Sequence, residues 1–465
     1  MRASKLGLLI LILGFGGAVE TAWNVRHHLD VGPAGCRVLG GKFYGNKFSF
    51  EEEQRRPLSP GTRVEVVNAF GSVETSLGEP GQLELRFEKV VYLDTQQDAG
   101  RFASGVLLKL EESGSALRVT TNRDEVRGRD RDVGFETHLR LRLPPGTALS
   151  VRNEHGRVDL CDAASVDAQN SYEPMSIRRI GGDATLQSRH GDVTIEQVEG
   201  PVSVNARYGD VELREVKGAA SLEVEHGDVS ASRVASLVAS QRYGETTADD
   251  VVGELKLTGS HAGLRANRVG GRASVETDYR DVSLANVGGD VSVTARHSAV
   301  SVSDAAGAVL VQTSYDDVTL AGITGPADVA VDHGGLRAER LAGGIRARTS
   351  GDQVVLESFK GAVDVETNRG GVHLAPEATL SDSVRVTVRN GGIRFSVPSG
   401  SRFELEAAVK RGEFEVGDLP GFKVTQSDGN RLVGRMGEGG SSVRLEVEQG
   451  DVTLEPLITL AERER

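Results

Sequence analysis

One position of this chain alternates between histidine and tyrosine at intervals of 17 or 18 residues, without a gap, from residue 155 to residue 333. Six of the ten histidines and five of the seven tyrosines occupy it. In chain order they are His155, Tyr172, His190, Tyr208, His226, Tyr243, His261, Tyr279, His297, Tyr315 and His333. A fixed period of this length is typical of repeat architectures, in which each repeat is one supersecondary unit.

The other positions of the repeat predict its shape. Apolar residues stand three, five and eight residues after the His/Tyr position, as in Val193, Ile195 and Val198. Glycine follows ten residues after it in most repeats, and a second alternating pair such as Val202 and Val204 comes next. Two-residue alternation predicts strands and glycine predicts turns, so each repeat should form two short strands and two bends. Neighbours stacked about 4.8 Å apart would bury the Val/Leu faces. The sequence therefore predicts an all-β, single-stranded parallel β-solenoid.

Register divides the chain into segments. Residues 149–375 hold the regular 18-residue coils, residues 376–456 are expected to form wider terminal coils, and 457–465 form a tail. Residues 61–148 combine a first coil, VEVVNAFGSVET, with a small α+β excursion, and residues 24–60 are expected to be a linker.

The excursion is expected to contain a strand at 83–91, a helix at about 95–109, and strands near 117–121 and 135–143. We expect it to cap the open end of the solenoid, because a bare terminal strand invites edge-to-edge aggregation.

Residues 1–23 are predicted to be a signal peptide or a membrane anchor. Arg2 and Lys5 precede fourteen apolar residues at 6–19, and a basic flank with a short apolar stretch is typical of a secretory signal. Small residues at 16–18 would permit cleavage, whereas Trp23 would suit the outer interface of a retained anchor. Both alternatives export the remainder to the periplasm or the cell surface, with or without a tether to the inner membrane.

Composition limits the partners. The net charge of −13 argues against nucleic acid or anionic lipid as the main partner, so membrane contact is expected only through the N-terminal segment. The chain has only two cysteines, Cys36 and Cys161, which excludes a disulfide framework and a Cys-rich zinc site. Whether these two cysteines pair outside the cytoplasm stays open.

The N-terminal apolar segment, the VEVVNAFGSVET coil and the repeated coils of GDVTI type (residues 191–195) together resemble a known family. It is the bacterial family of putative adhesins with β-strand repeats, a domain family of unknown function. The resemblance covers about residues 63–454 and rests on the repeat pattern. It implies an exported β-solenoid of the cell envelope, and it transfers no functional residues to this chain.

The His/Tyr series is the first candidate site. It shares strand parity with the core pair before it, so we expect the rings to point inward at a corner and to stack as a structural ladder. Histidines two coils apart, about 9.6 Å, cannot share one zinc ion, so no metal site is expected in the series. Charging histidines inside such a ladder should lower stability as the pH falls through the imidazole range.

Aspartates two residues after the His/Tyr position form the second candidate, with Asp192, Asp210 and Asp228 in successive coils. We expect each carboxylate to satisfy the backbone of its own turn. Calcium at these three residues is the weaker alternative, because calcium-binding β-rolls have a shorter repeat with more glycine and aspartate. No cofactor is expected.

The outward positions of the repeat are mixed, small and polar, and no Ser/His/Asp order, phosphate loop or zinc spacing occurs in the chain. The sequence therefore favours a non-catalytic extracytoplasmic scaffold with an adhesin-like surface for a protein or a glycan. One alternative is a carbohydrate-active enzyme or lectin on a β-helix, and another is a membrane-anchored envelope-stress accessory protein. The partner, the handedness of the coil and the oligomeric state stay open.

Overall fold

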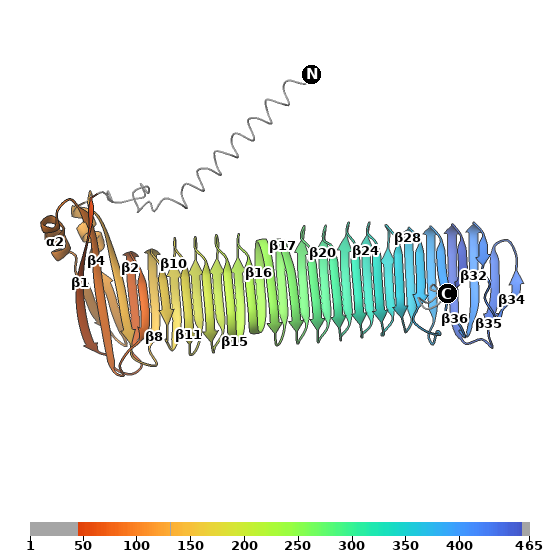
Figure 1. Ribbon diagram of the computed structural model, residues 1–465, viewed down its shortest axis with the longest axis horizontal. Coiled ribbons are helices and arrows are strands. Elements are labelled where there is room, and N and C mark those ends of the chain that lie inside the picture. Colours follow the sequence, from red (N-terminus) through yellow and green to blue (C-terminus); the bar gives the residue numbers. More distant parts are fainter. Residues whose placement is uncertain (1–44, 131, 458–465) are drawn as a thin grey trace, which may run out of the picture.

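The computed structural model describes residues 45–130 and 132–457. They form one elongated rod of stacked coils, with small helices at one end (Figure 1). Strands of successive coils pair in parallel at a one-coil offset, so that Val193 pairs with Val211 and Val211 pairs with Val229. The predicted parallel β-solenoid is confirmed.

Each coil places one strand on each of two faces, which we call face A and face B. Face A contains β8 (Ala148–His155), β10 (Ser165–Asn170), β12 (Ala184–Ser188), β14 (Val202–Ala206), β18 (Ala273–Asp278), β20 (Val291–Arg296), β22 (Val309–Ser314), β24 (Ala327–Asp332), β26 (Ile345–Thr349), β28 (Val363–Arg369) and β30 (Val384–Asn390). Face B contains β9 (Val158–Cys161), β11 (Met175–Ile180), β13 (Val193–Val198), β19 (Val282–Val287), β21 (Val300–Ala305), β23 (Val318–Ile323), β25 (Leu336–Leu341), β27 (Val354–Phe359), β29 (Val372–Pro376) and β31 (Ile393–Val397). Three long strands continue round the turns and serve both faces, namely β15 (Val211–Val224), β16 (Val229–Val251) and β17 (Leu255–Val269).

A left-handed residue in each coil explains the unusual spacing of the core residues on face B. Val193, Ile195 and Val198 are all fully buried, although the step from Ile195 to Val198 breaks two-residue alternation. Gln197 lies between them with φ of 59°, and the register skips it, which turns Val198 back to the core. The same position is left-handed in every regular coil, at Asp162, Arg179, Gln197, Glu215, Arg233, Asp250, Arg268, Asn286, Asp304, Gly322, Arg340 and Ser358.

The glycine ten residues after the His/Tyr position is required by the approach of neighbouring coils. A Cβ atom on Gly218 would lie only 2.2 Å from the backbone carbonyl carbon of Gly200, one coil away. The backbone of Gly218 has no positive φ. Close packing between coils therefore selects this residue, rather than the turn conformation that we expected from the sequence.

The N-terminal excursion covers the end of the rod. The first coil, β2 (Arg63–Phe70) and β3 (Val73–Leu77), pairs on one side with β8 and β9. On its other side it pairs with β6 (Ala116–Thr121) and β7 (Gly134–Leu143). The remaining elements are β4 (Gln82–Leu93), β5 (Leu108–Ser113), α2 (Gln96–Ser104) and α3 (Arg123–Arg129).

Two segments of this end differ from the sequence prediction. The expected helix at 95–109 ends at Ser104, because residues 108–113 pair with β6 as a hairpin. Residues 46–57, which we placed in a linker, form the edge strand β1 (Asn46–Pro57) against β4. Its charged side chains hid the strand pattern; Glu53, for example, pairs with Arg86 at 2.6 Å. Charge on an outermost strand also opposes further strand addition.

The C-terminal coils do not follow chain order. β30 and β31 pair with β36 (Ser441–Gln449) and β37 (Val452–Pro456), which in turn pair with β32 (Phe403–Arg411) and β33 (Phe414–Val416). The last segment of the chain thus lies between two earlier coils. β34 (Phe422–Ser427) and β35 (Arg431–Met436) pair antiparallel and lie at the far end (Figure 1).

Candidate functional site

The eleven His and Tyr side chains form a continuous column of rings, the His/Tyr ladder, along the turn that leads from face A to face B. Neighbouring ring centroids are 4.3 to 5.5 Å apart. The rings are parallel within 19° in every pair except Tyr243–His261, which is tilted by 32°. Apart from the slightly closer His155–Tyr172 pair, these distances fall in the range of offset aromatic stacking.

The predicted inward orientation of these rings is wrong. The five tyrosines are 47 to 55% exposed, so the ladder lies on the outer edge of the rod. Most strands of face A end before the ring, as β18 does at Asp278, so strand parity does not extend to Tyr279. Only β8, β16 and β17 include the ladder residue. In addition, seven of the residues are themselves left-handed, namely His226, Tyr243, His261, Tyr279, His297, Tyr315 and His333.

A buried arginine closes the N-terminal end of the ladder. The Phe70 ring lies 5.2 Å from that of His155 and extends the column by one ring. The Arg123 guanidinium lies 4.9 Å from the Phe70 centroid and 4.1 Å from that of Phe135, and donates to the carbonyl oxygen of Phe135. Burial lowers the pKa of Arg123 to about 10, so it stays charged at neutral pH and makes cation–π contacts with both rings.

Beneath the ladder runs a buried polar column that the sequence analysis missed. Nδ2 of Asn170 donates to the carbonyl oxygen of Glu173 at 2.7 Å, and Oγ of Ser188 donates to that of Gly191 at 2.8 Å. These side chains satisfy turn carbonyls that no strand can reach. The available signal was a polar residue, in an apolar alternation, two positions before the ladder position in most coils; the column is interrupted at Ala206, Val224, Gly259, Ala295 and Val331. Its members are Asn153, Asn170, Ser188, Gln241, Thr277, Thr313, Thr349 and Thr367.

The aspartates bind the next coil rather than their own turn, which corrects our expectation. The backbone amides of Asp210, Asp228 and Glu245 donate to the carboxylates of Asp192, Asp210 and Asp228 in turn, at 2.8 to 3.0 Å. The three carboxylates do share one groove of about 460 Å³ on the face B side of the ladder, together with Glu212 and Glu245. Within residues 45–130 and 132–457, no three His, Cys, Asp or Glu side chains are grouped so as to hold a metal ion.

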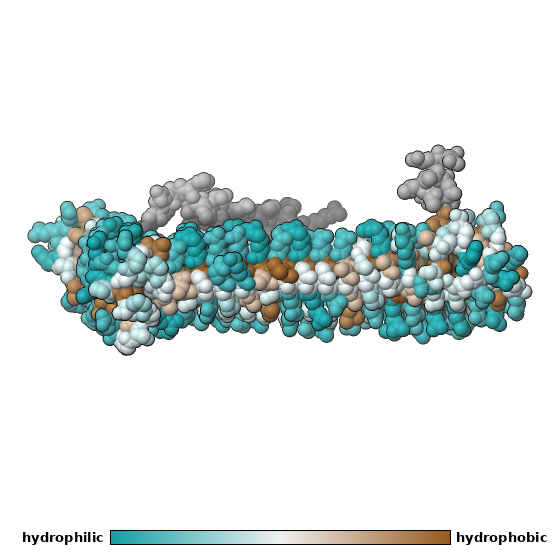
Figure 2. Space-filling model, turned by 90° about the horizontal axis from the view of Figure 1, so that it is seen from below, coloured by the Kyte–Doolittle hydropathy of each residue, from teal (hydrophilic) through white to brown (hydrophobic). Residues whose placement is uncertain are grey.

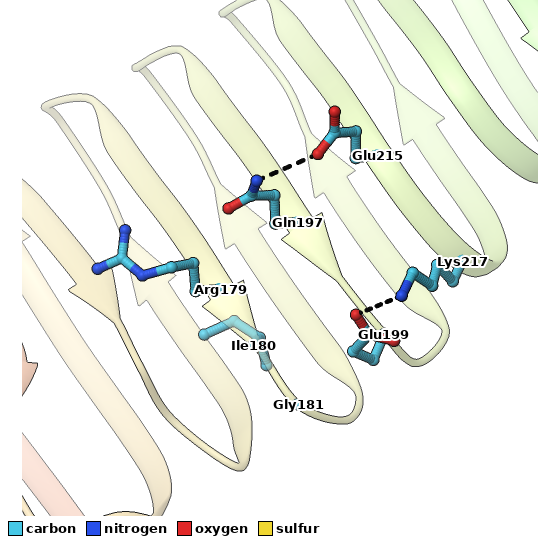
Figure 3. Close-up of a pocket in the computed structure, with 7 residues that line it drawn as sticks. All are labelled: Arg179, Ile180, Gly181, Gln197, Glu199, Glu215 and Lys217. Atoms are coloured by element: carbon cyan, nitrogen blue, oxygen red, sulfur yellow. Dashed lines mark hydrogen bonds and ion pairs between the residues drawn. The ribbon is translucent and has the colours of Figure 1, made fainter.

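The left-handed column of face B carries alternating charges (Figure 3). Arg179 makes two hydrogen bonds of 2.8 Å to Asp162 in the preceding coil, and this contact holds the pKa of Asp162 below its ordinary value. Glu215 accepts from Gln197 at 3.2 Å and from Arg233 at 2.9 Å. The groove along this column, about 400 Å³, is lined by Arg179, Ile180, Gly181, Gln197, Glu199, Glu215 and Lys217. Most of its charges are neutralised by a neighbouring coil.

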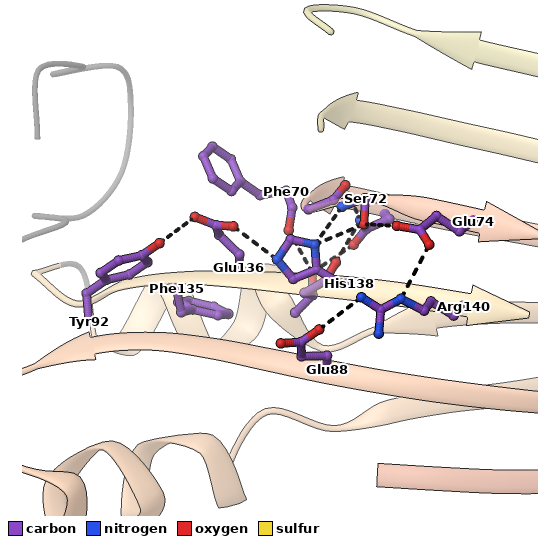
Figure 4. A network of polar contacts seen from close by, with 12 residues as sticks. Phe70, Ser72, Glu74, Glu88, Tyr92, Phe135, Glu136, His138 and Arg140 are labelled. Atoms are coloured by element: carbon purple, nitrogen blue, oxygen red, sulfur yellow. Dashed lines mark hydrogen bonds and ion pairs between the residues drawn. The ribbon is translucent and has the colours of Figure 1, made fainter. Parts of the chain in front are cut away.

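A polar network in the N-terminal end brings Ser72 to His138 and Glu136, from which it is far apart in the chain (Figure 4). Nδ1 of His138 lies 3.0 Å from both the backbone nitrogen and Oγ of Ser72, and Nε2 lies 3.0 Å from Glu136. Because the backbone amide donates to Nδ1, the Nε2–H donates to Glu136. The imidazole lone pair is thus engaged by the backbone, and the network fastens β3 to β7.

Neighbouring charges in this network are also paired. Tyr92 donates to Glu136 at 3.0 Å, and Arg140 contacts both Glu74 and Glu88. Burial acts to raise the pKa of Glu136, but hydrogen bonds from His138 and Tyr92 outweigh it and leave that pKa lowered. The pKa of Tyr92 is raised by burial and by Glu136.

A third groove lies on the face A side of the ladder, and we call it the amide groove. It has a volume of about 280 Å³ and is lined by Gln169, Asn170, Ser171, Gln187, Ser188, Arg189, Asn205 and Arg207. Two of these residues, Arg189 and Arg207, immediately precede His190 and Tyr208 of the ladder. Elsewhere the flanks of the rod are hydrophilic, and a narrow strip of higher hydropathy runs along the edge that Figure 2 shows.

Several predicted features fall outside the described residues. They include residues 1–23, Cys36 and the tail beyond Leu457. The other cysteine, Cys161, is buried with Sγ 2.9 Å from the carbonyl oxygen of Thr75, and burial raises the pKa of its thiol. No helix within 45–130 and 132–457 is long and apolar enough to span a membrane.

The left-handed backbone at Tyr279 leads to a prediction for the stability of variants at this position. Replacement by Phe should leave the free energy of unfolding within about 0.5 kcal/mol, because stacking on His261 and His297 is kept. Tyr279→Ala should lose about 1 to 3 kcal/mol of stacking. Tyr279→Gly should be about 1 kcal/mol more stable than Tyr279→Ala, because only glycine relieves the φ of 59°.

The matched control is Tyr208, which stacks in the same ladder but has no positive φ. There the order should reverse, with Tyr208→Ala more stable than Tyr208→Gly. Urea denaturation of the five variants measures both orders. The same order at both positions would contradict this account of the ladder.

A second prediction concerns pH. Our expectation that stability falls on acidification assumed that every histidine was buried, and we retain it for His155. Burial lowers the pKa of His155, so its neutral form is favoured in the folded state. Its contribution is therefore present above the unfolded-state pKa of about 6.5 and is lost as the pH falls through the lower folded value.

An NMR titration of the full chain should place the pKa of His155 below about 6.5. His155→Phe should keep the stack between Phe70 and Tyr172 and reduce the loss of stability between pH 7.5 and 5. A pKa of 6.5 or higher would refute this prediction.

Comparison with known proteins places part of the chain in a family. Residues 274–455 match the family described as Toastrack DUF4097. No curated protein matches the chain. One solved structure, the crystal structure of a "putative cell adhesion protein" from Clostridium sporogenes ATCC 15579, is 8% identical and covers 88% of this chain and 100% of that chain. Its TM-score of 0.13 is too low to carry an argument. The family match confirms the resemblance drawn from the repeats: residues 274–455 are similar to Toastrack DUF4097, a family named as a domain of unknown function.

Proposed function

We propose that this protein is a non-catalytic scaffold outside the cytoplasm, and that the edge bearing the His/Tyr ladder is its surface for a protein or a glycan. The observation that carries the proposal is the column of eleven stacked rings whose tyrosines are about half exposed. The proposed binding surface therefore lies along one edge of the rod and not on face A or face B.

The energetics of the ladder support a role at the surface. Each left-handed non-glycine residue costs roughly 1 to 2 kcal/mol, and each stacked pair returns about 0.5 to 1.5 kcal/mol. At the seven left-handed positions the two terms nearly cancel, so stability alone gives little reason to keep the rings there. The coil after His333 shows this directly, because Gly351 occupies the ladder position there and the solenoid continues.

Stacking also prepares the rings for binding. Tyrosine is enriched in binding surfaces because it offers a large contact area with few rotatable bonds. Each tyrosine of the ladder is already held between two histidine rings, so little rotamer entropy remains to be lost on binding. The phenol and imidazole edges alternate along the rod and present hydrogen-bonding groups to a partner.

Support for a non-catalytic role comes from the paired polar groups. The charges along face B are neutralised between coils, and Nδ1 of His138 accepts a hydrogen bond from the backbone nitrogen of Ser72. Support for export comes from residues 1–23, whose basic flank and apolar run are typical of a signal or an anchor.

Export is tested by fusing alkaline phosphatase, which is active only outside the cytoplasm, to the C-terminus of the full chain. We expect activity with residues 1–23 present and none after replacing Leu9 and Leu11 with Arg, since charge prevents membrane insertion. Equal activity of a cytoplasmic reporter fused to the unchanged chain would contradict export.

Binding at the ladder edge is tested on glycan and protein arrays with the purified full chain. The combined variant Tyr208→Ser, Tyr243→Gly and Tyr279→Gly should lose at least tenfold of the binding seen for any positive spot. The control replaces Glu199 and Lys217, which pair at 2.8 Å on the opposite turn, with Ser. A ligand that is lost only in this control would refute the assignment of the edge.

A further inference from the structure

We infer that the amide groove binds sugars that carry carboxylates, as a short stretch of an acidic glycan. This rests on the proposed function and narrows it to one place and one class of ligand. The site lies on face A beside Tyr172, His190 and Tyr208 of the ladder.

Three amide side chains occupy the same outward column in consecutive coils. Gln169 pairs with Gln187, and Gln187 pairs with Asn205, so the three stand about one coil spacing apart, near 4.8 Å. In the following coils the same column holds Glu223 and then Ser240. The run of amides is therefore local and is not a consequence of the repeat.

Amides suit the hydroxyl groups of a sugar. Each side-chain amide offers two donors and an accepting carbonyl, so one amide can serve a hydroxyl in either direction. Asn205 is held in place by its hydrogen bond to Glu223, at 2.7 Å. Below this row, Asn170 and Ser188 are committed to turn carbonyls, which makes the floor of the groove rigid.

Two guanidinium groups give the groove its preference for an anion. Arg189 and Arg207 lie one coil apart at the ladder side of the groove. Arg207 has an ion pair with Glu225 at 3.5 Å, whereas the Arg189 guanidinium has no acidic partner among residues 45–130 and 132–457. A guanidinium matches a carboxylate with two parallel hydrogen bonds.

The groove favours a glycan over an acidic polypeptide. Tight protein interfaces rely on apolar or aromatic anchors seated in a desolvated pocket. The lining here consists of amides, hydroxyls and guanidinium groups, without an apolar side chain. The acidic groove of Asp192, Asp210 and Asp228 lies on the other side of the ladder, so the sugar carboxylate must lie on the face A side.

The test is isothermal titration of the full chain with oligogalacturonate, and with its methyl ester as the neutral analogue. We expect binding to the acid and at least tenfold weaker binding to the ester. Arg189→Gln should weaken the binding of oligogalacturonate at least tenfold, and Gln187→Ala should weaken it severalfold. The control Arg346→Gln, also on face A and paired with Asp364 at 3.4 Å, should bind as the unchanged chain does.

The outcomes separate this inference from the proposed function. Equal binding of polyglutamate, lost in Arg189→Gln, would mean that the groove takes acidic polypeptides, and the glycan inference would be wrong. If oligogalacturonate does not bind, but another array ligand binds the unchanged chain and not the tyrosine variant, the assignment of the amide groove is wrong and the proposed function still holds. If oligogalacturonate does not bind and no array ligand depends on the ladder tyrosines, both the inference and the proposed function are wrong. Circular dichroism melting of Arg189→Gln should match the unchanged chain, because the side chain is exposed.

Discussion

Parallel backbone pairing at an offset of one coil is the interaction on which the rest of the structure depends. Because each residue pairs with its equivalent about 4.8 Å away, every position of the repeat becomes a column along the rod. Each residue type in a column interacts with its equivalent in the next coil, and this interaction repeats along the rod. Rings stack, an aspartate reaches the next amide, a glycine meets the next glycine, and like charges would repel unless alternated. The side-chain chemistry of this chain follows from that one spacing.

Buried and exposed columns at the same turn have different roles. Buried polar residues below the ladder satisfy carbonyls, and the rings above it are exposed. The left-handed residue of face B restores the apolar register and at the same time points a charged side chain at its neighbour, as Arg179 does toward Asp162. Regular columns build the rod, whereas local departures, such as the amides at Gln169, Gln187 and Asn205, give a part of it a distinct surface.

Repetition made much of this structure predictable. The fold class, the coil length and the residues of the ladder could be predicted from the spacing, because a spacing that recurs through eleven His and Tyr residues is compatible with few architectures. Orientation could not, since strand parity holds only within a strand and Tyr279 lies beyond the end of β18. The edge strand β1 was hidden by its charges, and the network of Ser72 with His138 joins residues 66 apart in sequence. Both depend on tertiary contacts rather than on a local pattern.

The return of the chain at its C-terminal end has a consequence for how the rod is completed. β30 exposes an unpaired edge until β36 arrives, and the chain must first run outward through β32 and the β34–β35 hairpin. The coils up to β31 can form in chain order, whereas β36 can pair with β30 only after the chain has passed through β32 and the β34–β35 hairpin. Loss of β36 and β37 would therefore leave the edges of β30 and β31 open to pairing with another chain, even with every earlier coil intact.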